Sequence, residues 1–387
     1  MESSPVTISL NKALWAVFLL LTFTAANAAR VDSRKSTAVF YGPNLPTDVL
    51  SQFSRIIVEA DNVKRHELDE LRANGGDVFA YLSVGEVSPT RKWFDKIQPS
   101  WVLGDNRVWD SKVMDLHSPG WQKFMMESIV DPLWEAGYRG LFLDTMDSFK
   151  LFAKNERQER EQVQALVSLL QAIHKRYPEM RFIANRGFEV LPSIGYLLEA
   201  VAAESLFESW DNGLKVYRET KSEDQDWLLD QLHQVKAKLP VDIIIIDYVE
   251  PQKRDKAEKV ASRITKEGFI PWISIPALDM VGVGDFQPQL KTYLLLTDSK
   301  TESHHPLELN KYSRLQRDLA ADGLKLEVHD IQSGMPTGHL IGRYLGIITA
   351  QPFNEQFSIY QNWLRRQQHE GINIQVLNAD AAIPSGS

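Results

Sequence analysis

Several apolar segments of this chain end in side chains that can take part in acid–base chemistry. The clearest is Gly140-Leu-Phe-Leu-Asp-Thr-Met-Asp-Ser148, in which Asp144 ends the apolar run and Asp147 follows it closely. The run has no helical period and therefore predicts a buried parallel strand. Because an unpaired ionised carboxylate is costly to bury, we expect Asp144 where this strand emerges into a polar mouth.

The ends of the other predicted strands also carry acidic, amide and aromatic side chains. Glu204 follows Ala202 and Ala203, whose small side chains leave room for a sugar ring. Neighbouring carboxylates repel each other and raise each other's pKa. Packing alone therefore hardly explains why acidic residues recur at the ends of successive strands. The other strand-end residues, which we predict to contact a substrate, are Tyr41, Glu59, Tyr81, Glu86, Asp147, Asn185, Arg186, Asp247, Tyr248 and Trp272.

Paired carboxyl groups are what the hydrolysis of a glycosidic bond requires. One carboxylate acts as nucleophile or base, and one protonated carboxyl acts as acid. Their surroundings must hold the two pKa values apart, so that both forms coexist near neutral pH. We predict Asp144 as the nucleophile and Glu204 as the general acid/base. Flat apolar faces for sugar rings would come from Tyr41, Tyr81, Tyr248 and Trp272.

Each of these residues also has a purely structural interpretation. Asp144 could cap the turn that follows it, and Glu204 could form a buried ion pair with Arg186. Asp147 could cap a turn. Glu86 and Asp247 could form salt bridges at the rim, and Tyr81 and Trp272 could pack in the core.

Composition limits the other chemistries. The chain has no Cys, which excludes disulfides and thiolate catalysis, and it has no nucleophilic-serine motif. Asp144, Asp147 and Asp247 could hold a hard cation, but the nine His residues are scattered without metal-ligand spacing. We therefore predict no metal and no cofactor. The net charge of -8 argues against nucleic acid and is compatible with a cationic or neutral partner.

The order of the predicted elements supplies a scaffold on which these strand ends can meet. Eight strand-like runs alternate with helical segments, which predicts an α/β fold, a (β/α)8 TIM barrel over residues 37–285. An open doubly wound sheet is the alternative, although the first turn lacks its glycine-rich sequence. The predicted strands are Thr37–Gly42, Arg55–Ala60, Asp77–Glu86, the run from Gly140 to Asp144, Arg181–Arg186, a strand ending at Ala202–Ser205, Val241–Tyr248 and Phe269–Ile275.

Two further segments flank the predicted barrel. Ala13–Ala25 is apolar and precedes Ala26-Asn-Ala28, so we predict that residues 1–28 are a signal peptide and that the protein is periplasmic or secreted. An uncleaved membrane anchor is the alternative, for which the run is short. Beyond the breaks at Gly282 and Gly284, residues 290–387 are predicted to form a small α/β domain of unknown role, without a catalytic motif.

Four motifs together resemble glycoside hydrolase family 114. They are Tyr81-Leu-Ser-Val-Gly-Glu86, the segment from Gly140 to Ser148, Ala184-Asn-Arg-Gly-Phe-Glu189 and Ala202-Ala-Glu-Ser-Leu-Phe207. The resemblance covers roughly residues 38–278. It implies a TIM barrel with endo-α-1,4-polygalactosaminidase activity on a cationic, partly deacetylated amino-sugar polymer, and it places the acidic pair on Asp144 and Glu204. Family proteins of the exopolysaccharide type continue into a deacetylase, an activity that we do not expect here.

We therefore predict an exported glycoside hydrolase that cleaves α-1,4 linkages in a galactosamine-rich exopolysaccharide. Its expected partners are that polysaccharide and the machinery that exports it. The alternative is a non-catalytic carbohydrate-binding or scaffold protein of an exopolysaccharide system, because the same barrel can serve as a lectin.

Overall fold

The computed structural model describes residues 35–302, 306–349 and 358–376. The predicted signal peptide lies outside these residues, and so does the end of the chain from residue 377. In the part that is described, no helix is both long enough and apolar enough to cross a lipid bilayer.

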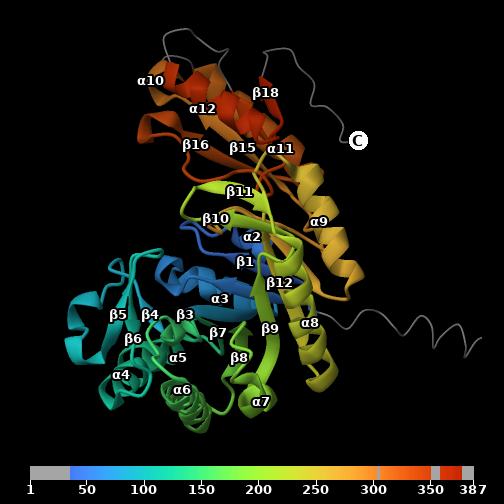
Figure 1. Ribbon diagram of the computed structural model, residues 1–387. Coiled ribbons are helices and arrows are strands. Elements are labelled where there is room, and N and C mark those ends of the chain that lie inside the picture. The colour runs from blue at the N-terminus through green and yellow to red at the C-terminus, as the bar shows by residue number, and fades with distance from the viewer. Residues whose placement is uncertain (1–34, 303–305, 350–357, 377–387) are drawn as a thin grey trace, which may run out of the picture. The chain divides into compact units, whose positions relative to one another are not determined.

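A largely parallel sheet is the central element of the described residues (Figure 1). Its strand order is β1-β2-β3-β7-β8-β9-β12-β13-β14, and only the last pair is antiparallel. The backbone N–H of Tyr41, after β1, donates to the carbonyl of Leu278, after β13, at 2.7 Å, so the sheet nearly closes into a barrel. The strands are β1 (Thr37–Phe40), β2 (Arg55–Val58), β3 (Asp77–Ser83), β7 (Gly140–Asp144), β8 (Arg181–Asn185), β9 (Leu198–Glu204), β12 (Asp242–Tyr248), β13 (Ile270–Ser274) and β14 (Val283–Gly284).

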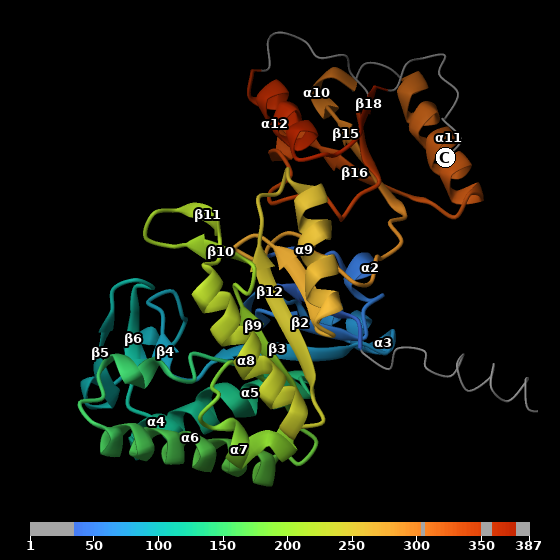
Figure 2. The ribbon, with the colours of Figure 1, turned by 45° about the vertical axis from the view of Figure 1, so that its right-hand side comes forward.

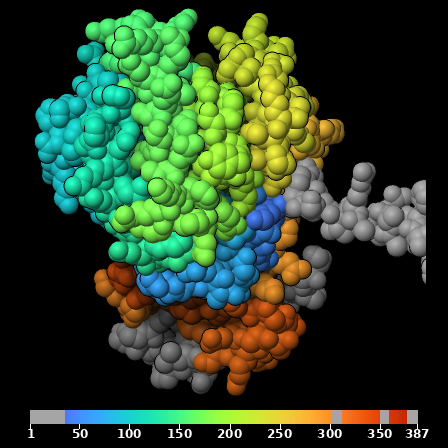
Figure 3. Space-filling model, turned by 90° about the horizontal axis from the view of Figure 1, so that it is seen from below, coloured from blue at the N-terminus to red at the C-terminus, as the bar shows by residue number. Residues whose placement is uncertain are grey.

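The predicted TIM-barrel-like fold is thus confirmed, and each predicted barrel strand is present. Helices lie between the strands (Figure 2), and in the space-filling view of Figure 3 the colours pass across the molecule from cyan through green to yellow, in chain order. The helices are α2 (Thr47–Leu50), α3 (Arg65–Ala73), α4 (Pro119–Phe124), α5 (Asp131–Ala136), α6 (Glu156–Arg176), α7 (Leu191–Ile194), α8 (Ser222–Lys238) and α9 (Arg254–Lys266). Between α4 and α5, the helical segment contains a π-helical stretch at Met125–Val130.

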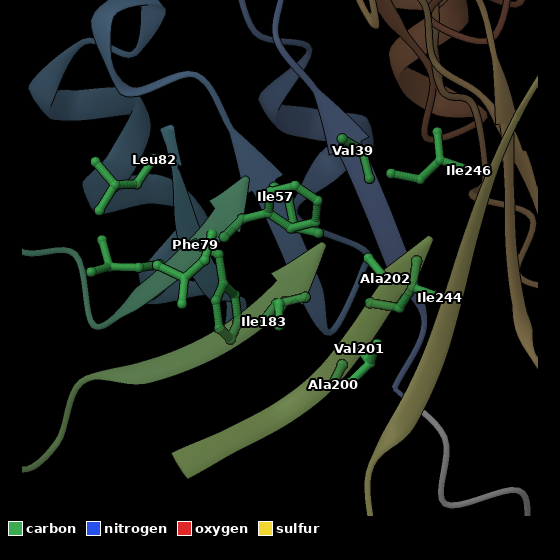
Figure 4. Close-up of a cluster of buried hydrophobic side chains, with 14 of the residues drawn as sticks. Val39, Ile57, Phe79, Leu82, Ile183, Ala200, Val201, Ala202, Ile244 and Ile246 are labelled. Carbon is green, nitrogen blue, oxygen red and sulfur yellow. The ribbon is translucent and has the colours of Figure 1, made fainter. Parts of the chain in front are cut away.

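The barrel strands are held together by apolar side chains on both faces. Ile57, Phe79 and Ile183 come from three different strands and have no exposed surface, and Figure 4 shows them in one cluster. Burial on both faces explains why these strands read as continuous apolar runs. On the outside, the side chain of Asn155 caps α6, whose Leu166 and Leu170 pack against the sheet.

A network of ion pairs occupies the amino end of the barrel. Arg55, only 1% exposed at the start of β2, donates to Glu199 of β9 at 3.0 Å, to Asp242 of β12 at 2.9 Å and to Thr37 of β1 at 3.1 Å. Arg181 of β8 bonds Glu199 at 2.9 Å as well. Because these residues come from β1, β2, β8, β9 and β12, the network ties together strands that are far apart in the sequence.

Two excursions leave the carboxyl end of the barrel. The first, after β3, is a small antiparallel sheet of β4 (Glu86–Val87), β5 (Val102–Asn106) and β6 (Ser111–Met114). The second, after β9, is the hairpin of β10 (Glu208–Asp211) and β11 (Val216–Glu219). Their tips meet where the side-chain nitrogen of Asn212 donates to the carbonyl of Val108 at 2.7 Å. The sequence predicted a short extra strand at Val113–Leu116, which overlaps β6, and it did not predict the β10–β11 hairpin.

The C-terminal residues form a separate parallel sheet, with the order β16-β15-β17-β18. The predicted small α/β unit is therefore present, and its core contains Leu294, Ile347 and Leu364. The domain boundaries at residues 285 and 290 remain a prediction. The elements are β15 (Thr292–Thr297), α10 (Ser299–Glu302), α11 (Pro306–Ala321), β16 (Lys325–Asp330), β17 (Gly346–Thr349), α12 (Ser358–His369) and β18 (Ile374–Val376).

The Arg55 network gives a test of what holds the barrel together. The substitution Arg55→Met keeps the apolar stem but leaves the carboxylates of Glu199 and Asp242 without this cation. We expect a loss of about 3–5 kcal/mol in the free energy of unfolding, measured by urea denaturation. The control, Arg160→Met, removes an exposed pair with Glu156 and should change stability by less than about 0.5 kcal/mol. Equal effects of the two substitutions would contradict this account.

Candidate active site

Three neighbouring strands end in the polar side chains that form the centre of the site. Asp144 ends β7, Asn185 ends β8 and Glu204 ends β9. The side-chain nitrogen Nδ2 of Asn185 donates to Asp144 Oδ1 at 2.9 Å and to Glu204 Oε1 at 2.8 Å. The structure therefore brings together the two residues that the sequence singled out as a carboxylate pair.

The spacing of the pair follows from these bonds. Since one nitrogen lies within hydrogen-bond distance of both carboxylates, Asp144 Oδ1 and Glu204 Oε1 are less than about 6 Å apart, the largest separation that the two bonds allow. The other oxygen of each carboxylate accepts a tyrosine hydroxyl. Tyr81 donates to Asp144 Oδ2 at 2.7 Å, and Tyr248 donates to Glu204 Oε2. Each carboxylate thus receives one donor from Asn185 and one from a tyrosine.

The surroundings of Asp144 oppose its ionisation. Burial, and secondly the charge of Glu204, raise the pKa of Asp144 to about 6, while the hydrogen bonds from Tyr81 and Asn185 and that from the Thr145 backbone work in the opposite direction. Burial also raises the pKa of the Tyr81 and Tyr248 hydroxyls well above the usual range. The two tyrosines therefore keep their protons and act as permanent donors to the pair.

Aromatic and cationic groups line the β1–β3 side of the pair. The rings of Tyr41 and Tyr81 meet edge to face, with 5.1 Å between their centroids. The guanidinium of Arg91 lies 5.6 Å from the Tyr81 ring and grips both oxygens of Glu59, at 2.8 and 2.7 Å. Arg91 was missed in the sequence because it stands in a loop, far from any strand end.

The backbone is strained directly after each of the three central residues. Thr145, Arg186 and Ser205 follow Asp144, Asn185 and Glu204, and their φ angles are 59°, 55° and 63°. Non-glycine residues rarely adopt this left-handed conformation, which costs of the order of 1 kcal/mol or more for each. Strain of this kind gathers at functional sites, where the chain must turn sharply to aim the side chain before it.

The turn at Thr145 is fixed by its neighbours. The Thr145 hydroxyl donates to the carbonyl of Asp144 at 2.7 Å and accepts the backbone N–H of Gly85 at 2.9 Å. A Cβ at Gly85 would lie 2.2 Å from the Thr145 carbonyl oxygen, so only glycine fits. The Gly85 that the sequence placed in a motif therefore supports the turn that follows Asp144.

Asp247 departs from the predicted role of a substrate contact. It is completely buried, and its carboxylate accepts the backbone N–H groups of Leu206, Phe207 and Glu208 at 2.6, 2.8 and 2.9 Å. Burial raises its pKa to about 7, although these three donors lower it. Asp247 therefore fixes the turn that follows Glu204, and no sugar can reach it.

Four other residues that were predicted to contact a substrate have different surroundings from those expected. Trp272 has no exposed surface and packs edge to face on Phe53, so it fills the core and cannot serve as a sugar platform. Buried Glu86 accepts bonds from Asn106 and Ser111 of the β4–β6 sheet. Glu59 is paired with Arg91, as described above. Half-buried Asp147 stands at the start of a short helix, but its side chain does not make the capping bond.

Arg186 does not form the ion pair with the Glu204 carboxylate that was considered as an alternative. Its Nη2 donates to the backbone carbonyl of Glu204 at 2.7 Å, and the side chain lines a neighbouring cavity of about 300 Å³. Trp210 and Trp227 also line this cavity, together with Arg218 and Lys221. No pattern in the sequence indicated this cavity, because the β10–β11 hairpin that lines it was not predicted.

Metal binding finds no support among the described residues, where no group of three or more His, Cys, Asp or Glu side chains is placed to hold an ion. The site does provide one carboxylate pair, which accepts hydrogen bonds from Asn185 and from two tyrosine hydroxyls. At the carboxyl end of a parallel barrel, such an arrangement is typical of enzymes that cleave glycosidic bonds, and the protein is a glycoside hydrolase.

The family follows from comparison with known proteins. The model of glycoside hydrolase family GH114 matches residues 21–286, so the chain belongs to this family. The glycoside hydrolase domain of PelA from Pseudomonas aeruginosa is 39% identical in sequence; the match covers 64% of this chain and 97% of that domain, with a TM-score of 0.60. An uncharacterised protein of Methanocaldococcus jannaschii is 22% identical over 248 residues, which are 59% of this chain and 69% of that protein.

The role of Asp247 can be tested by the substitution Asp247→Asn. The amide group places N–H donors against backbone N–H donors and leaves at least one of them buried without an acceptor. We expect a loss of about 1–3 kcal/mol in the free energy of unfolding, together with a fall in activity as the Glu204 turn loosens. Urea denaturation measures the first effect. The exposed substitution Asp226→Asn is the control, and an unchanged stability of Asp247→Asn would disprove the anchoring role.

Proposed function

We propose that this enzyme cleaves α-1,4 linkages in a galactosamine-rich, partly deacetylated exopolysaccharide, with retention of the anomeric configuration. The observation that carries the mechanism is the short distance between Asp144 and Glu204, whose oxygens share one donor nitrogen. A pair about 5 Å apart leaves no room for a water between a base and the sugar, as inversion requires, and favours direct attack by one carboxylate.

In the first step, a carboxylate oxygen of Asp144 attacks the anomeric carbon. The bond from that carbon to the glycosidic oxygen breaks, and Glu204 gives its proton to the leaving oxygen. The product is a glycosyl ester on Asp144. The donors from Tyr81 and Asn185 hold the attacking group in one orientation, and this lowers the entropic part of the barrier.

In the second step, Glu204 works as a base. It takes a proton from a water molecule, whose oxygen attacks the same anomeric carbon and releases the Asp144 carboxylate. Two inversions at one carbon restore the original configuration. The bond from Tyr248 keeps Glu204 in place during both steps.

The charge of the site supports an amino sugar as substrate. Asp144 and Glu204 face each other at the centre, and the whole chain carries a net charge of -8. A polymer with free ammonium groups is attracted by this field, and its charge offsets the repulsion between the carboxylates. The similarity to the glycoside hydrolase domain of PelA agrees with a polysaccharide as the target.

Export is part of the proposal, because an exopolysaccharide lies outside the cytoplasm. The apolar run at Ala13–Ala25, followed by small residues, supports a signal peptide over residues 1–28 and a periplasmic or secreted enzyme. The export machinery of the polysaccharide would then be a neighbour of the protein.

The catalytic assignment is tested with Asp144→Asn and Glu204→Gln. Each substitution removes an acid–base or nucleophilic group and keeps the shape, so we expect a loss of kcat of at least about 1,000-fold, with binding preserved. Cleavage is measured by the release of reducing ends from an α-1,4-linked galactosamine polymer. Binding is measured by co-sedimentation of the enzyme with the same polymer. The exposed substitution Asp69→Asn serves as the control. A wild-type protein that binds the polymer without cutting it would refute the proposal.

The stereochemical outcome gives an independent test. Since retention is expected, the first reducing end released from an α-linked substrate should be the α-anomer. Proton NMR of the anomeric region, recorded in the first minutes before mutarotation, distinguishes the two anomers. Initial release of the β-anomer would show an inverting reaction and would exclude Asp144 as the nucleophile.

A further inference from the structure

Asn185 occupies an unusual position in this site. Its strand, β8, lies between β7 and β9 in the sheet, and so its side chain lies between the two carboxylates. A single nitrogen, Nδ2, donates one hydrogen to each of them. Among the described residues, no other side chain is seen to hydrogen-bond both members of the pair.

The orientation of this amide is dictated by its neighbours. Carboxylate oxygens are acceptors, so the amide nitrogen must face them and the amide oxygen must turn away. That oxygen, Asn185 Oδ1, is buried and has no hydrogen-bond partner in the part of the chain that the structure describes. A buried acceptor without a donor costs about 1–3 kcal/mol.

The unbonded oxygen of Asn185 lowers stability, which suggests that this residue is kept for its function. Stability alone would be better served by an apolar side chain, or by an amide whose two ends were both bonded. Asn185 is also followed by Arg186 in the strained left-handed conformation. The fold therefore accepts an unfavourable feature at each of two consecutive residues, Asn185 and Arg186, and it places one nitrogen between Asp144 and Glu204.

We propose that Asn185 is a positioning residue, whose nitrogen sets the gap between Asp144 and Glu204 and keeps negative charge on Asp144. This inference rests on the proposed function, and it replaces the expectation that Asn185 contacts the substrate. Only 8% of the residue is exposed, which leaves little surface for a sugar. While Asp144 is esterified, the same nitrogen still holds Glu204 for its second task as a base.

The other groups around Asp144 do not replace this donor. Tyr81 of β3 bonds only the far oxygen, Oδ2. Glu204 of β9 is an acceptor and raises the pKa of Asp144 by its charge. Tyr41, next to β1, and Tyr248 of β12 lie within electrostatic range of Asp144 and stay protonated, because burial raises their pKa values. The backbone N–H of Thr145 also bonds Asp144, but Asn185 is the donor that bonds both carboxylates.

The test uses Asn185→Ala, which removes both donors, and Asn185→Ser, whose hydroxyl can serve only one carboxylate at a time. We expect Asn185→Ala to lower kcat by about 10- to 100-fold with KM changed less than about threefold. The acidic limb of the pH–rate profile should move up by about one pH unit, because a donor that favours the charged Asp144 is lost. Asn185→Ser should lie between this variant and the wild type.

A second readout does not depend on the substrate. The carboxyl carbon of Asp144 can be followed by NMR in aspartate-labelled protein, with its signal assigned from Asp144→Asn. Its titration midpoint should be near pH 6 in the wild type and higher in Asn185→Ala. Asn74→Ala, at an exposed position outside the site, is the matched control.

The outcomes separate the two proposals. If the wild type leaves galactosamine polymers intact, the proposed function fails, and the NMR titration still decides the role of Asn185. If the Asp144 midpoint is the same in Asn185→Ala, Asn185→Ser and the wild type, the positioning role is overturned. A raised KM with unchanged kcat would also overturn it and would make Asn185 a substrate contact.

Discussion

Repulsion between buried carboxylates is the constraint around which the carboxyl end of this barrel is built. Asp144 and Glu204 share one nitrogen, and Asp247, a short way off, is bonded by three backbone N–H groups. Without these donors, the acidic groups would be neutral or would drive the strand ends apart. The turn after Glu204 and the first residue of the β10–β11 hairpin deliver backbone donors to the oxygens of Asp247.

The two ends of the barrel solve the problem of buried charge differently. At the amino end, Arg55 and Arg181 neutralise Glu199 and its neighbours, so this end is closed by full ion pairs. At the carboxyl end the central pair is met mainly by neutral donors. Neutral donors leave the charge available for chemistry, whereas a paired cation would hold the carboxylates in a form that neither attacks nor transfers a proton. Apolar strands separate the two ends.

The sequence predicted the elements far better than the directions of side chains. Continuous apolar runs revealed the barrel strands, but they do not tell which residues face the axis, because both faces are buried. Asp247 and Tyr248 illustrate this. They are adjacent and point to opposite sides of β12, so one anchors a turn and the other bonds Glu204. The β10–β11 hairpin was missed because its residues are mostly polar, and the cavity beside it was missed as a result.

The contact between Val108 and Asn212 has a consequence for how freely the two excursions move. It ties the excursions after β3 and β9 together, and the strands that carry Asp144 and Asn185 lie between these two in the sheet. The contact is a single exposed hydrogen bond. Such a bond is worth about 1 kcal/mol, so it is broken in roughly one molecule in six at any instant. Loop motions of this kind take nanoseconds to microseconds, much less than a catalytic cycle. The two excursions can therefore separate and meet again many times within one catalytic cycle.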